Sequence, residues 1–132
     1  MLMLPRILRI MRKPLSQISS TLFFACCLFL LGQTMAWFQN NSQFVWDWWK
    51  DKPIITALIW SFPVSLTFWW GSKWSYEALG TVWASRLLSF GLSYICFPLL
   101  TWFLMNESAL TPKNIVSSVL AFTLVGIQIF WK

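Results

Sequence analysis

Four long apolar stretches alternate with short polar ones along the chain. They cover residues 17–38, 54–70, 86–105 and 114–131, and each consists mainly of aliphatic, aromatic and small residues. A helix of about 20 residues crosses a hydrocarbon core of about 30 Å, because each residue adds about 1.5 Å. The pattern therefore predicts an all-α fold in which residues 16–132 form an integral membrane bundle of four transmembrane helices.

The polar stretches carry signals for the starts of helices. Pro53 and Pro112 suit the first position of a helix, where no N–H donor is needed, and Thr111 suits the N-cap. The sequence predicts three connections: a loop over 39–52, a loop with an interfacial turn or short helix over 71–85, and a tight turn over 106–113.

The first 15 residues are both basic and apolar. Arg6, Arg9, Arg12 and Lys13 stand there among Leu, Ile and Met. A basic amphipathic arm of this kind is expected to lie on the membrane surface. A targeting peptide is the alternative interpretation, because the segment is basic and free of acidic residues.

The basic residues are divided unevenly between the two sides of the predicted bundle. Seven lie on the side of the termini (Arg6, Arg9, Arg12, Lys13, Lys73, Arg86 and Lys132), against Lys50, Lys52 and Lys113 on the other side. Cytoplasmic segments carry the excess of Lys and Arg in membrane proteins. We therefore expect both termini in the cytoplasm, in a bacterial inner membrane, a plasma membrane or an equivalent organellar membrane. Most of the 11 tryptophans fall near span ends, as expected of an aromatic belt.

Composition agrees with a membrane protein and excludes several other classes. Hydrophobic residues make up 58% of the chain and charged residues 11%, whereas soluble domains carry about 25% charged residues. The net charge of +6 is split between the arm and the span ends, so it indicates topology and contact with anionic lipid. Nucleic-acid binding is not expected, because no folded basic face is available.

Residues that carry out chemistry are scarce. Histidine is absent, and the four carboxylates all lie in polar stretches between the apolar ones. The three cysteines lie inside apolar stretches without the CxxC spacing of a zinc or redox site. We therefore expect no enzymatic activity, no metal site and no cofactor.

Three short motifs resemble a known group of membrane proteins. Residues 34–38 read TMAWF and close the first span, Lys52-Pro53 and the ALIWS of residues 57–61 open the second, and Pro98 to Gly126 contains FLMNESALTP. In this order and spacing they are similar to a small family of the drug/metabolite transporter superfamily. The resemblance implies a four-helix unit like the small multidrug resistance proteins, which work as dimers around a central substrate chamber.

One departure from that pattern bears on mechanism. Small multidrug resistance proteins bind cations and protons through a glutamate in the middle of the first span, where residues 24–28 here read FACCL. The function expected from the resemblance is therefore movement of a small organic molecule without an intramembrane carboxylate. The alternative is a non-catalytic accessory subunit of a larger membrane complex, for example a photosynthetic or respiratory assembly, which the Trp-rich faces also suit.

Four residues inside or beside the spans are candidates for substrate binding: Gln33, Trp60, Tyr94 and Arg86. Each has a plainer interpretation. Gln33 is also expected to form a helix–helix hydrogen bond, because an unpaired amide in hydrocarbon is costly. Trp60, near Pro63, and Tyr94 also suit core packing, and Arg86 also suits snorkelling to the cytoplasmic interface.

Small residues recur along one face of each of the last two spans. Ser85, Ser89 and Ser93 form one ridge, and Ser117 and Ala121 form another. Small residues let helices approach closely, so these ridges are candidates for helix packing and for an oligomer interface. The expected partners are membrane lipid and either a second copy in the same orientation or other membrane subunits.

Overall fold

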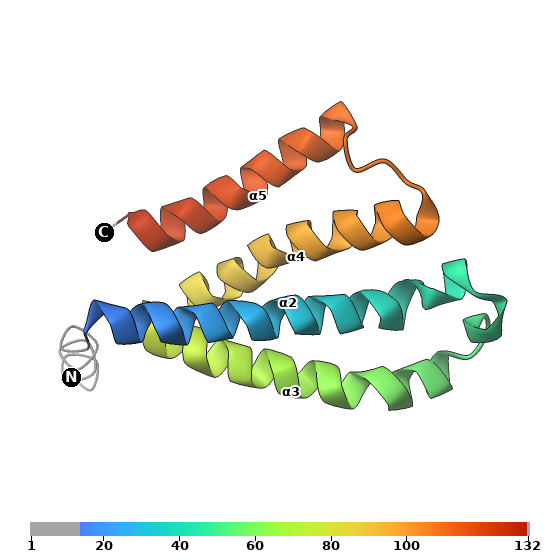
Figure 1. Cartoon of the computed structure of the whole chain (residues 1–132), viewed down its shortest axis with the longest axis horizontal. Helices are drawn as coiled ribbons and strands as arrows, with labels where there is room; N and C mark the ends of the chain where they lie inside the picture. The colour runs from blue at the N-terminus through green and yellow to red at the C-terminus, as the bar shows by residue number, and fades with distance from the viewer. Residues whose placement is uncertain (1–13, 132) are drawn as a thin grey trace.

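The computed structural model describes residues 14–131, and these residues form four long helices (Figure 1). The helices are α2 (Leu15–Val45), α3 (Pro53–Leu79), α4 (Val82–Met105) and α5 (Pro112–Phe130), with a short 3-10 helix, η1 (Asp47–Trp49), after α2. All four are long and apolar enough to cross a membrane. The all-α, four-helix membrane fold expected from the sequence is confirmed, whereas the predicted amphipathic arm, residues 1–15, lies almost wholly outside the described residues.

The helices form a layered bundle rather than a closed ring. Figure 1 shows α2 between α3 and α4, with α5 on the far side of α4. The α2–α3 and α4–α5 connections lie together at one end of the bundle. The α3–α4 turn lies at the other end, beside the start of α2 and the end of α5. We call these the connection end and the terminal end.

The contact between α2 and α3 depends on two glycines. A Cβ atom on Gly32 would stand 2.8 Å from Oγ1 of Thr67, and one on Gly71 would stand 2.9 Å from the ring of Phe29. Phe29 is completely buried. The two glycines therefore let the helices approach closely and leave room for a large aromatic side chain at their interface.

Helix α5 is the least buried of the four helices. It packs on α4, where Ala121 is its one buried residue within Pro112–Phe130. A Cβ on Gly91 of α4 would collide with the side chain of Val125. Close packing at this point therefore holds α5 against α4, while most of the other side chains of α5 are exposed on the surface of the bundle.

Two predicted loops are wrong in part, because the helices continue into them. Helix α2 continues to Val45, and α3 continues to Leu79. Within this extension of α2, the amides of Asn40 and Asn41 donate to carbonyl oxygens four residues back, each at 3.0 Å. The 31 residues of α2 span about 46 Å, so its ends reach beyond a hydrocarbon core of about 30 Å, where polar side chains are well solvated.

The predicted starts of α3 and α5 are confirmed, whereas α4 begins at Val82, four residues before the predicted start of the third span at residue 86. Pro112 is the first residue of α5, and Oγ1 of Thr111 accepts a hydrogen bond from the backbone N–H of Asn114 at 3.4 Å. Pro53 likewise begins α3. The turn before α4 is tight, because Gly80 adopts a left-handed conformation with φ of 80° that glycine takes readily.

Candidate functional site

A cavity of about 680 Å³ with a mixed polar and aromatic lining lies between α2, α4 and α5, and we call it the polar cavity. Three groups of residues line it: Gln33, Ala36, Trp37, Asn40 and Asn41 on α2; Phe90, Ser93, Tyr94, Phe97, Pro98 and Thr101 on α4; and Glu107, Ser108, Ala109, Asn114, Ser117 and Ser118 on the α4–α5 turn and α5. Because Glu107, Ser108 and Ala109 of the α4–α5 connection are part of its lining, the cavity extends to the connection end.

Helical spacing brings the α4 lining to one face. Phe90, Tyr94, Phe97 and Thr101 recur every three or four residues. Pro98, between them, has no N–H, so the carbonyl of Tyr94 lacks its usual helical donor. This wall of the cavity therefore combines aromatic rings with the hydroxyl groups of Tyr94 and Thr101, beside a backbone carbonyl that lacks its helical donor.

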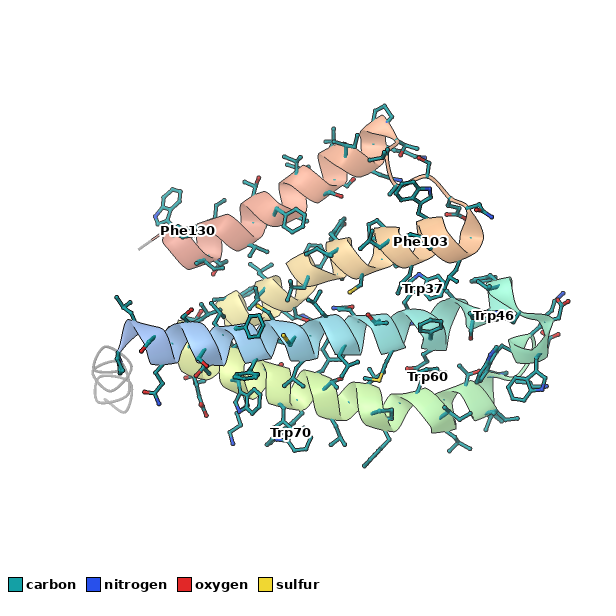
Figure 2. All side chains as sticks on the ribbon, in the orientation of Figure 1. Trp37, Trp46, Trp60, Trp70, Phe103 and Phe130 are labelled. Atoms are coloured by element: carbon teal, nitrogen blue, oxygen red, sulfur yellow. The ribbon has the colours of Figure 1, made fainter. Side chains whose placement is uncertain are left out.

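Hydrogen bonds between α2 and α4 hold the cavity wall in place. Nε1 of Trp37 donates to Oγ1 of Thr101 at 3.0 Å, and both side chains are buried. Figure 2 shows Trp37 between the two helices. Nearer the middle of the bundle, Nε2 of Gln33 donates to the carbonyl oxygen of Ser89 at 3.1 Å and to its Oγ at 3.4 Å. Such polar contacts give helices a fixed register in an apolar solvent.

The charge on the cavity is confined to its outer end. Glu107 is the single charged side chain among the lining residues, and it is exposed in the α4–α5 turn. The other polar groups are amides and hydroxyls. Nδ2 of Asn114 donates to the carbonyl oxygen of Ser108 at 3.3 Å, which ties the start of α5 to the turn beside Glu107.

Four of the sequence-predicted residues meet at this cavity. Gln33 and Tyr94, predicted to bind substrate, line it together with Ser93 and Ser117, predicted to pack helices. The hydroxyl group of Ser93 donates to the carbonyl oxygen of Phe90 at 2.6 Å, and Phe90 also lines the cavity. The residues of the two small-residue ridges that face the cavity thus leave space between helices instead of closing it.

The other ridge residues are buried within the chain. Ser85 is hydrogen-bonded to Ser75 of α3, and Ser89 accepts the hydrogen bond from Gln33 of α2. Ala121 is buried where α5 packs on α4. These residues pack helices within one molecule, and their part in an oligomer interface stays a prediction.

Two predicted substrate-binding residues lie elsewhere. Trp60 stacks on Phe38 with ring centroids 5.8 Å apart, in the interface of α3 and α2 (Figure 2). Arg86 is exposed near the start of α4, at the terminal end. Neither residue is among those that line the polar cavity.

Several cavity residues were not predicted from the sequence to bind substrate. Asn40, Asn41 and Asn114 fell in or beside stretches interpreted as loops, where amides are common and carry no specific signal. Trp37 was assigned to the aromatic belt. The spacing of Trp37, Asn40 and Asn41 with Gln33 along one helical face is the signal that would have joined them to the site, once α2 is known to continue to Val45.

The size and lining of the cavity suit the binding of a small molecule. Ligand sites in proteins commonly have volumes of about 300–1,000 Å³, with aromatic walls and a few convergent polar groups. Within residues 14–131, no three His, Cys, Asp or Glu side chains gather so that they would hold a metal ion. No protein family, curated protein or solved structure matches this chain.

Proposed function

We propose that this multi-pass membrane protein is a transporter of the drug/metabolite-transporter type that binds a small organic molecule in the polar cavity. The observation that supports the proposal most strongly is the cavity itself. Amides and hydroxyls are costly to leave unpaired in hydrocarbon, yet many of them border one open space between α2, α4 and α5. Most of these groups already donate one hydrogen bond within the protein. A bound polar molecule would pair with the oxygen lone pairs and amide N–H groups that remain.

The lining indicates what kind of molecule fits. Trp37, Phe90, Tyr94 and Phe97 offer aromatic surfaces, while Gln33 and the asparagines offer hydrogen bonds. We therefore infer a molecule with both a ring and polar substituents. The protein binds this molecule and moves it across the membrane, without enzymatic catalysis.

Uptake into proteoliposomes tests this proposal. The probes are radiolabelled aromatic amino acids, nucleosides and aromatic amines, which all combine a ring with polar groups. We expect saturable uptake of at least one probe, and the Tyr94→Leu variant should weaken its apparent affinity about tenfold, the effect of losing about 1.4 kcal/mol of buried polar and aromatic contact.

Ile95→Leu is the matched control, because Ile95 is the next residue on α4 and is not part of the cavity lining. Its uptake should equal that of the unaltered protein. The proposal is wrong if correctly folded protein shows no saturable uptake or binding of any probe, or if the two variants lower uptake equally.

The second candidate function is that of an accessory subunit in a larger membrane complex. Helix α5 supports it, because this helix packs on α4 and exposes large apolar side chains such as Val116, Val119 and Phe130. A partner helix would cover this face. Native purification in a mild detergent separates the two functions: an accessory subunit runs inside a large assembly with other chains, whereas a transporter runs alone or as a homo-oligomer.

A further inference from the structure

A second pocket, distinct from the polar cavity, lies on the opposite face of α2. Its volume is about 470 Å³, and all five residues that line it are aromatic: Phe38, Trp46, Trp48, Trp49 and Trp60. We call it the aromatic pocket. The ring of Phe38 lies between those of Trp46 and Trp60, nearly parallel to both, with interplanar angles of 16° and 15°. This stack forms a continuous apolar wall from the end of α2 to the side of α3.

A cation stands at the outer edge of the aromatic pocket. Nζ of Lys52 lies 4.1 Å from the centroid of the Trp48 ring. Lys52 directly precedes α3, at the connection end of the bundle, where the helices leave the hydrocarbon. Trp60 lies eight residues after Lys52 along α3, about 12 Å deeper into the bilayer. The pocket therefore runs from a positive edge at the interface to an apolar interior.

We propose that the aromatic pocket is a binding site for a phospholipid of the surrounding bilayer, and that it prefers anionic lipids. The phosphate group would pair with the ammonium group of Lys52, and the upper part of an acyl chain would lie on the rings of Trp46, Phe38 and Trp60. In a phospholipid, the charged headgroup lies at the interface and the apolar chains lie deeper in the membrane. The charged edge and the apolar interior of the pocket lie at the same depths, so the two are complementary. This proposal does not depend on transport through the polar cavity.

The indole N–H of Trp60 adds a polar feature to this wall. Its Nε1 atom is buried and has no hydrogen-bond acceptor among the described residues. An unpaired buried donor is unfavourable, and the ester carbonyl of a phospholipid is an acceptor at this depth. Because Nε1 is closed off from the surface, pairing requires the ring to turn when the lipid enters.

The terminal end of the bundle provides a matched control. Nζ of Lys73 also lies over a tryptophan ring, that of Trp69, with 5.8 Å between Nζ and the ring centroid. However, neither residue lines the aromatic pocket. A lysine and an interfacial tryptophan are thus present at both ends, but only the pair at the connection end includes a residue of the aromatic pocket.

Native mass spectrometry tests the proposal on the full chain in nanodiscs of equal parts phosphatidylglycerol and phosphatidylcholine. We expect one phospholipid retained per chain after release into detergent, with phosphatidylglycerol preferred. Lys52→Gln should reduce that preference about fivefold, the effect of one basic residue near an anionic group. Lys73→Gln should leave it unchanged.

Two tryptophan variants test the apolar part of the site. Trp60→Leu should reduce retention of both lipids, because it removes most of the deep wall. Trp48→Leu should also reduce retention. It should not impair folding, because the Trp48 side chain is 58% exposed. Trp69→Leu is the control and should retain lipid normally. Retention that survives both pocket variants, or a headgroup preference that does not respond to Lys52→Gln, would overturn the proposal.

Discussion

The amide of Gln33 makes a polar contact between α2 and α4 near the middle of the bundle. Its Nε2 atom reaches both oxygens of Ser89 across the two helices, while its side chain also borders the polar cavity. A residue in this position has two roles, because it fixes helix register and presents polar atoms to a ligand. The plainer interpretation of Gln33 as a helix–helix contact and its proposed role in binding are therefore compatible.

Replacing Gln33 should have a modest effect on stability. We expect Gln33→Leu to lower the free energy of unfolding in detergent by about 0.5–1.5 kcal/mol, because interhelical hydrogen bonds in membranes contribute about that much. Gln43→Leu is the control, since Gln43 is exposed and donates only to the nearby carbonyl oxygen of Asn40. Equal losses in the two variants, measured by steric trapping or thermal unfolding, would contradict a structural role for the Gln33 contact.

Replacing a glycine by alanine should have opposite effects on stability in α3 and in α5. Gly71→Ala should destabilise the protein by about 1–3 kcal/mol, because the added methyl group would stand 2.9 Å from the buried ring of Phe29. Gly126→Ala should be neutral or slightly stabilising, because nothing lies within 4 Å of the added atom and alanine favours helix. Thermal unfolding of both variants decides the matter. If Gly71→Ala is as stable as Gly126→Ala, the close packing of α2 on α3 is incorrect.

At the scale of the element, the sequence predicted the number of helices and the starts of α3 and α5 but not all of their ends. The starts have local chemistry that can be read directly, such as Thr111 before Pro112. The ends of α2 and α3 lie in polar interfacial turns, where hydropathy falls although the backbone hydrogen bonds continue. Hydropathy reports membrane depth, whereas helix length depends on hydrogen bonding, so the two boundaries need not coincide.

Single residues of the candidate site could be predicted from the sequence, but the cavity that they form could not. Gln33 and Tyr94 were singled out because buried polar atoms need partners, and both line the polar cavity. The cavity itself depends on how far α5 stands from α2, which is a property of packing at Gly91 and Ala121 that spacing along one helix does not show. Trp60 has the same sequence signals as Tyr94, and only the packing places it in the aromatic pocket.

At the scale of the whole molecule, the start of α2 and the end of α5 share one end of the bundle with the α3–α4 turn (Figure 1). The excess of basic residues on that side predicts that it is cytoplasmic. In a variant without native cysteines, a membrane-impermeant maleimide added outside cells should label Leu110→Cys, in the α4–α5 turn, but not Val82→Cys at the start of α4. Both positions are exposed, at 68% and 72%. Labelling of Val82→Cys alone would reverse the orientation, and labelling of both would indicate dual insertion.

The positions of the carboxylates predict how transport is coupled. Glu107 lies in the α4–α5 turn at the outer end of the polar cavity, and Glu77 lies in the last turn of α3 rather than in the loop expected for it. Neither lies in the middle of a span, so we expect uptake without the steep proton coupling that a buried glutamate gives. A pH-sensitive dye inside proteoliposomes should report no substrate-dependent proton flux. A flux that Glu107→Gln or Glu77→Gln abolishes would contradict this placement.

The existence of a polar cavity open at the connection end is tested most directly by thiol accessibility. Ser93 lines the cavity 12 residues before the end of α4, about 18 Å from that end, while Ile95, two residues away, is not part of the lining. A thiol reacts as the thiolate, which forms in water but not in lipid. In reconstituted protein without native cysteines, a small water-soluble methanethiosulfonate should modify Ser93→Cys rapidly and Ile95→Cys slowly or not at all. Equal protection of both cysteines would show that water does not reach this depth between α2, α4 and α5, and the proposed binding site would then be absent.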